Sequence, residues 1–178
     1  MTSDPLDILL RHFAWANRVV LDACRPLSRE QLHQSFDIGL GSVHATVLHI
    51  VCCVEGWTQR AQGNPWTTQD AEAAASDSAI AIDALIARSD RATHAIGQFT
   101  EELRRNDQLG YVHESTFHPK DAPPVTVRYT NGAAITHCLV HGQYHRAQAI
   151  NMLRRLGVTP LPEVDIMDWH HEVEGNAP

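Results

Sequence analysis

The sequence lacks the features that mark several large classes of protein. It has no basic stripe and its 178 residues carry a formal net charge of -7, so we expect no binding to nucleic acid. Its apolar runs fall far short of the roughly 20 residues that span a bilayer, so we expect no membrane insertion. It has no internal repeat and no low-complexity segment. What remains is a globular protein that acts on, or binds, a small molecule.

Cysteine is scarce and its spacing is uninformative. The four cysteines are Cys24, Cys52, Cys53 and Cys138, and no two of them have CxxC spacing. The N-terminal stretch MTSDPLDILLRHF has neither a basic region nor a small-residue cleavage site, so we predict a cytoplasmic protein without a secretion signal. Cytosolic thiols stay reduced, and the simplest interpretation is that these are small buried apolar residues.

The composition and the apolar periodicity predict one all-α domain over residues 1–178. The hydrophobic fraction of 43% and the charged fraction of 20% are globular values. Apolar residues recur at helical spacing in four stretches. The predicted helices cover residues 5–24, 42–61, 71–104 (firmest over 80–103) and 130–156. Four such helices favour a four-helix bundle with a long connection between the third and the fourth.

The segments between and after these helices are less regular. Residues 28–32 are predicted to form a short turn of helix capped by Ser28. In the long connection, Val125, Val127 and Tyr129 alternate with polar residues and predict one short extended segment. The tail from Leu161 is expected to dock as an extended segment and then to become disordered.

The stretch HCLVHGQYHR, residues 137–146, places three histidines four residues apart. At about 100° per residue, His141 and His145 fall in the apolar stripe of the predicted helix, whereas His137 lies about 70° from its centre. His137 and His145 are also about 12 Å apart along the axis. The inward pair is therefore His141 and His145, and two imidazoles at this spacing can chelate one metal ion.

A third ligand would come from another helix, and LHIVCCVEGW, residues 48–57, offers several donors. His49 lies among apolar residues, and Cys52 and Cys53 are rival donors about one turn later. His44 lies near the start of the helix and is expected to be exposed. Glu55 points away from His49 by helical phase and is expected to face solvent or an interface.

Three segments together resemble the DinB superfamily of four-helix-bundle metal-binding proteins. They are, in order, HFAWANRVVLDAC, GSVHATVLHIVCCVEGW and HCLVHGQYHRAQAINMLRRLG. The resemblance implies that His49, His141 and His145 bind the metal. The family commonly has HRGQ where this chain has HRAQ, with Ala147, and this difference leaves the ligands untouched.

The resemblance implies an open metal position but leaves the chemistry undecided. A divalent ion, zinc or nickel, held by three neutral imidazoles suits a thiol-dependent S-transferase with a low-molecular-weight thiol as cosubstrate. The alternatives are a metal-dependent hydrolase and a non-catalytic metal-binding stress-response protein. No general base stands out, and His44, His137 and Glu55 are only candidates.

Two further expectations concern neighbouring residues and assembly. His137 is expected beside the site or at the surface. Arg146 is expected to form a structural salt bridge, with an anionic substrate group as the alternative partner. A homodimer is expected, because the second helix is apolar nearly all round and Trp15 and Trp57 are large apolar groups on the first two helices.

Overall fold

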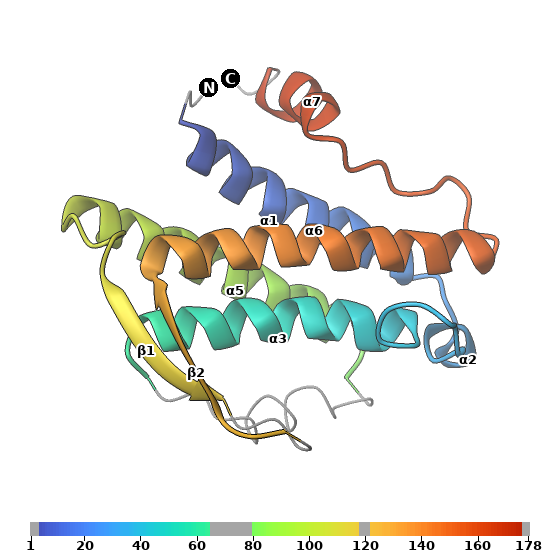
Figure 1. The fold of residues 1–178 in the computed structure, drawn as a ribbon. Helices are drawn as coiled ribbons and strands as arrows, with labels where there is room; N and C mark the ends of the chain where they lie inside the picture. The colour runs from blue at the N-terminus through green and yellow to red at the C-terminus, as the bar shows by residue number, and fades with distance from the viewer. Residues whose placement is uncertain (1–3, 65–79, 118–121, 176–178) are drawn as a thin grey trace.

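Four long helices form the body of the protein. The computed structural model describes residues 4–64, 80–117 and 122–175. The long helices are α1 (Pro5–Cys24), α3 (Val43–Ala61), α5 (Ile82–Arg105) and α6 (Asn131–Arg155). A short helix, α2 (Arg29–Leu32), lies in the α1–α3 connection. The arrangement confirms the predicted four-helix bundle (Figure 1); residues 71–79 of the predicted third helix lie outside the described residues.

Side-chain caps fix where three of the long helices begin. Asp4 accepts a hydrogen bond from the backbone N–H of Leu6, at the start of α1. Ser42 does the same for α3 and Thr130 for α6, each accepting from the N–H three residues later. Such caps satisfy backbone donors that have no partner inside the helix. The starts predicted from these polar residues are confirmed.

The bundle pairs α3 with α6 and α1 with α5 around one apolar core (Figure 1). Each helix contributes an inward stripe of side chains. Among the core residues that are 2% exposed or less are Phe13, Val20, Leu48, Leu85, Ile96, Ile135, Met152 and Leu153. Removing this apolar surface from water is the main stabilising contribution, and it fixes the rotation of α6 about its axis.

The α5–α6 connection contains a hairpin instead of one extended segment. Strand β1 (Val112–Phe117) pairs antiparallel with β2 (Val125–Thr130), with Val112 opposite Thr130. The predicted segment at Val125–Tyr129 was therefore right, but its partner was missed. The sequence of β1, VHESTF, is mostly polar, so it carries no clear alternation to reveal a strand.

The tail packs back on the bundle and then turns helical. Trp169 of α7 (Ile166–Trp169) is 2% exposed, and η1 (His170–Glu174) continues from it as one π-helical turn. His12 Nε2 donates to the backbone carbonyl of Val164 at 2.9 Å. The docking was predicted correctly, whereas the expected disorder is wrong as far as Gly175. Within the described residues, no helix is long and apolar enough to cross a membrane.

Candidate metal centre

Helices α3 and α6 bring together two histidines that are 92 positions apart in the sequence. His49 points from α3 and His141 from α6, and their Nε2 atoms lie 2.9 Å apart. The distance is that of a hydrogen bond between one protonated and one unprotonated nitrogen. The cross-helix contact predicted from the sequence is thus present.

Cys53 joins this pair from the next turn of α3. Its Sγ lies 3.4 Å from His49 Nε2. The donor atoms of His49, Cys53 and His141 all lie within 4.8 Å of one another, so the three could hold a metal ion. This donor group contains two imidazoles and a thiol and no carboxylate.

His145 lies against the same cluster from one turn further along α6. Its ring centroid is 4.7 Å from that of His49 and 4.4 Å from that of His141, and the residue is 6% exposed. Its donor nitrogens do not belong to the tightest group, which instead includes Cys53. Two residues, His145 and Cys53, therefore compete for the third position beside His49 and His141.

The orientation of His145 favours its use as a ligand. Its Nδ1 lies 2.8 Å from Oε1 of Gln148, three residues further along α6. An amide oxygen only accepts, so Nδ1 carries the proton and Nε2 keeps its lone pair free. A carbonyl or carboxylate partner on the second ring nitrogen is the usual support of a metal-binding histidine.

The donor set fits a divalent ion of the zinc type. With zinc–nitrogen distances of about 2.0–2.1 Å, two imidazole nitrogens on a tetrahedral ion lie about 3.3 Å apart. The observed 2.9 Å between His49 and His141 needs only a few tenths of an ångström of widening. A thiolate and an imidazole nitrogen on such an ion would be about 3.6 Å apart, close to the 3.4 Å of Cys53 and His49.

Burial keeps His49 and His141 in the neutral form in which imidazole binds a metal, and keeps Cys53 in the thiol form, which does not bind. Desolvation, and then the charge of His145, lower the pKa of His49. Desolvation and the neighbouring histidines lower the pKa of His141 to about 4. Burial raises the pKa of the Cys53 thiol to about 11, so without a metal Cys53 is a protonated thiol.

His137 lies beside the cluster and outside it. Its ring stacks on His141 with centroids 4.9 Å apart, and its other neighbour is Trp57 at 4.8 Å. Trp57 also packs edge-on against Tyr129 of the hairpin. His137 therefore braces His141, as expected for a residue beside the site, and Trp57 already has partners within the chain.

The other candidate donors of α3 face away from the cluster. Cys52 Sγ lies 3.6 Å from the Arg88 guanidinium on α5, and Arg88 also pairs with Glu55 at 2.8 and 2.5 Å. Glu55 thus turns away from His49, as predicted, but toward another helix. Cys52 is separated from Cys53 by the helical rotation of one residue, which leaves only Cys53 as a rival thiol.

Two expectations from the sequence are wrong. His44 is 2% exposed instead of exposed, because its Nε2 reaches the backbone carbonyl of Ile80 at 2.9 Å. Arg146 forms no salt bridge with any described residue; its guanidinium donates to the amide oxygens of Asn17 and Gln143, each at 2.7 Å. In both cases the partner comes from tertiary packing that periodicity does not report.

The sequence interpretation also missed Gln148 and the loop that contacts it. Gln148 is the glutamine of HRAQ, one turn after His145, and this i,i+3 spacing was the available signal. Gly39 has φ of +57°, and a Cβ there would lie 2.4 Å from Gln148 Oε1. A glycine is therefore needed where the loop crosses the side chain that orients His145.

Comparison with known proteins identifies a family and nothing narrower. The model of the DinB family matches residues 2–174. No curated protein and no solved structure matches the chain.

Proposed function

The chain belongs to the DinB family, and we propose that it is a metal-dependent enzyme with one divalent ion on His49, His141 and His145. The observation that carries this proposal is the convergence of two α6 imidazoles and one α3 imidazole at one point of the bundle. His145 is buried and His49 and His141 are half-buried beside it. One metal ion would bind a nitrogen of each ring.

We choose His145 over Cys53 as the third ligand because of where their protons lie and because Gln148 orients the His145 ring. The hydrogen bond that His145 Nδ1 donates to Gln148 leaves His145 Nε2 with a free lone pair, whereas the Cys53 thiol must first lose its proton. Because structural zinc sites usually have four protein ligands, recruitment of Cys53 as a fourth ligand would favour the non-catalytic alternative.

We assign the reaction class as thiol S-transfer to a small-molecule substrate. A divalent ion with three neutral protein ligands keeps its positive charge and offers an open position that lowers the pKa of a bound thiol or water. In this chain His137 stacks on His141 and limits its rotation, and Gln148 holds His145. Zinc and nickel both suit three imidazoles.

The reaction class is tested by replacing the native ion with cobalt. A thiolate bound to cobalt gives a charge-transfer band in the near ultraviolet. We expect this band on addition of glutathione, mycothiol or bacillithiol to the Cys53→Ser variant, in which no internal thiol competes. Turnover of activated esters without a thiol band would replace the transferase by a hydrolase. If neither the thiol band nor ester turnover is observed, the non-catalytic stress-response protein is the alternative that remains.

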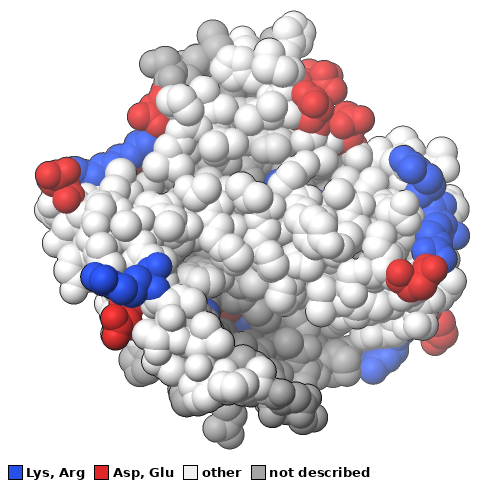
Figure 2. All heavy atoms as spheres, in the orientation of Figure 1, with Lys and Arg blue, Asp and Glu red and all other residues white. Residues whose placement is uncertain are grey.

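We also propose that the chain forms a homodimer through the face over α6. Figure 2 shows this face as mainly uncharged, with charged residues gathered toward its margin. Tyr144 is 61% exposed and Leu40 is 45% exposed. Leu40 follows Gly39, which contacts Gln148, and Tyr144 precedes Gln148 by about one turn, so both belong to the same region.

Light scattering tests the dimer directly. The double change Leu40→Lys, Tyr144→Lys should convert a dimer into a monomer at micromolar concentration, because charges would be buried in the interface. Val125→Lys is the matched control, since Val125 is 50% exposed on the hairpin. A monomeric unmodified protein would remove this proposal and leave the metal site unaffected.

A further inference from the structure

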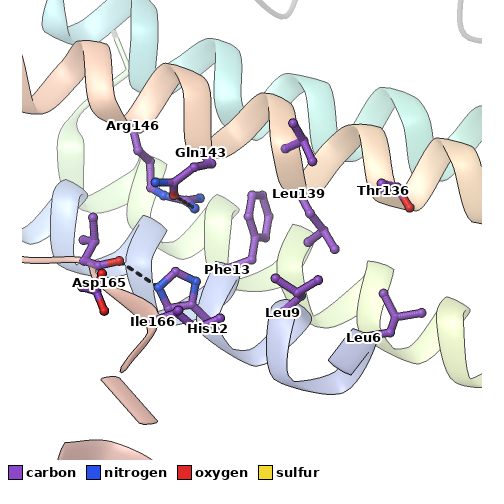
Figure 3. A pocket seen from close by; sticks show the side chains of 12 residues that line it. Leu6, Leu9, His12, Phe13, Thr136, Leu139, Gln143, Arg146, Asp165 and Ile166 are labelled. Atoms are coloured by element: carbon purple, nitrogen blue, oxygen red, sulfur yellow. Dashed lines mark hydrogen bonds between the residues drawn. The ribbon is translucent and has the colours of Figure 1, made fainter. Parts of the chain in front are cut away.

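A separate cavity of about 350 Å³ lies on the side of α6 that faces α1. Its walls come from α1, α6 and the docked tail, with Val164, Asp165 and Ile166 contributed by the tail. In Figure 3, Arg146 and Gln143 lie at one end beside Phe13, and Leu6 and Thr136 lie at the other end. The volume is in the range of small-molecule sites.

Most of the cavity wall is apolar. The apolar side chains that line it are Leu6, Leu9, Phe13, Leu139, Val140, Val164 and Ile166. The tail that closes one wall is held by the 2.9 Å hydrogen bond from His12 to the Val164 carbonyl. A cavity with such walls takes the hydrocarbon part of a ligand, since burying apolar surface drives the association.

At one end of the cavity is a buried positive charge that has no negative partner among the described residues. Arg146 is 2% exposed, and its two hydrogen bonds go to the neutral amides of Asn17 and Gln143. Its Nε is buried and has no hydrogen-bond partner. The guanidinium also lies 5.0 Å from the centroid of the Phe13 ring. A buried charge of this kind normally has an ionic partner.

The charge of Arg146 persists at neutral pH. Desolvation lowers the pKa of its guanidinium to about 10, which still leaves it protonated. Gly142 is what allows the guanidinium and Phe13 to approach α6, because a Cβ there would lie 2.3 Å from Phe13 Cε2 and 3.4 Å from Arg146 Nη1. The cation is thus held in place by packing on both sides.

Arg146 is the one arginine or lysine among the described residues of the lining, so a ligand can pair a single negative charge there. Asp165 lines the cavity from the tail and accepts a hydrogen bond from the backbone N–H of Met167 at 2.7 Å. Its carboxylate would repel a second anionic group. The ligand class that matches one cation, one nearby carboxylate and apolar walls is a monoanion with a hydrocarbon body.

We infer that this cavity binds a small monocarboxylate with an aliphatic or aromatic body, its carboxylate on Arg146 and its body between α1, α6 and the tail. The guanidinium supplies a planar fork of donors suited to carboxylate. The site lies on the α1-facing side of α6, about 100° of helical rotation from His145, so the proposed metal-dependent reaction does not use it.

Calorimetric titration of the metal-loaded full chain tests the inference with three matched probes. Phenylbutyrate, phenylbutanol and phenylbutylamine share one hydrocarbon body and differ in charge. We expect phenylbutyrate to bind one per chain, phenylbutanol at least about tenfold more weakly, and phenylbutylamine not at all, because the charge-assisted hydrogen bonds require the carboxylate. Equal affinity for the acid and the alcohol would overturn the role of Arg146.

Two variants locate the probe. Arg146→Met keeps a long side chain and should remove the preference for the acid over the alcohol. Thr136→Trp places a large ring at the exposed far end of the cavity and should abolish binding of both. Ala133→Trp, exposed on the same helix but absent from the lining, is the matched control and should bind normally.

The same variants separate this cavity from the metal. A carboxylate that bound to the metal ion would be unaffected by Thr136→Trp, and that result would overturn the inference. Unchanged affinity in Arg146→Met would do the same. If Arg146→Met proves unfolded by circular dichroism, Arg146→Lys replaces it: a loss of affinity for phenylbutyrate with no loss for phenylbutanol supports the inference, and unchanged affinity for phenylbutyrate overturns it.

Discussion

The two sides of α6 handle buried polar groups in opposite ways. On the side facing α3, His141 and His145 meet His49, and the three rings contact one another. On the side facing α1, Arg146 carries a buried charge that meets only amides. His145 and Arg146 are consecutive, yet about 100° of helical rotation sends them to different neighbours.

The difference indicates which kind of ligand would satisfy the polar groups on each side of α6. Neutral imidazoles can hydrogen-bond to each other, so the α3 side tolerates the absence of a metal at moderate cost. A guanidinium has only donors and cannot be satisfied by another cation. The α3 side therefore calls for a cation and the α1 side for an anion, on one helix.

The largest expected effect is removal of the metal from the α3 side. A ligand that binds only the folded state stabilises it by about 2.7–4.1 kcal/mol at 100–1,000 times its Kd. We expect a chelator to lower the Tm of the unmodified protein and of Arg146→Met by the same amount, and to leave His49→Ala unchanged. A chelator effect that depends on Arg146 would show that the two sides are not independent.

The next effect concerns packing on the α1 side. In Gly142→Ala the new methyl group would lie 2.3 Å from Phe13 Cε2, and overpacking of this kind costs about 1–3 kcal/mol. Gly97→Ala is the matched control on α5, where nothing lies within 4 Å of the new Cβ; better helix propensity should stabilise it by up to about 1 kcal/mol. Urea denaturation measures both, and equal shifts would contradict the tight contact.

The support of His145 predicts a smaller, more specific loss. Gln148→Ala and Gly39→Ala should each weaken metal affinity by about 10–100-fold, since both disturb the partner of His145 Nδ1. Gly63→Ala shares the strain of a positive φ, at +78°, but has open space around its Cβ. Competition with a chromophoric chelator should therefore find unchanged affinity in Gly63→Ala.

The smallest effect is the pH dependence of the metal-free protein. Because burial lowers the pKa of His141 to about 4, the unfolded chain takes up a proton near pH 6.5 while the folded chain does not. The contribution of this group to stability is present above pH 6.5 and is lost as the pH falls toward 4, and the partial exposure of the ring makes it small. The urea midpoint of His141→Phe should fall less between pH 7 and pH 5, and parallel curves would contradict this.

Much of the fold could be predicted from local patterns. The caps Asp4, Ser42 and Thr130 and the apolar periodicity of the four helices act within a few residues, so the sequence alone locates them. The same phase argument placed His145 inward, and the structure buries it. His145 meets His49 only because the helices pack as a bundle, and the four predicted helices already favoured that arrangement.

What could not be predicted depends on partners far away in the sequence. His44 is buried because the carbonyl of Ile80 lies above it, and β1 exists because β2 offers a partner to a polar segment. Arg146 was expected to find a carboxylate, and packing gave it Asn17 and Gln143 instead. Periodicity predicts which face of a helix points inward, but it does not identify the residues that the face contacts.

The most direct test of the account is the metal content of three purified variants measured by elemental analysis. The unmodified protein should contain one divalent ion per chain. His145→Ala should lose most of it, whereas Cys53→Ser and His137→Ala should keep it, because Gln148 prepares His145 and not Cys53 for binding. Full metal in His145→Ala together with loss in Cys53→Ser would contradict the three-histidine site and assign the third position to the thiol.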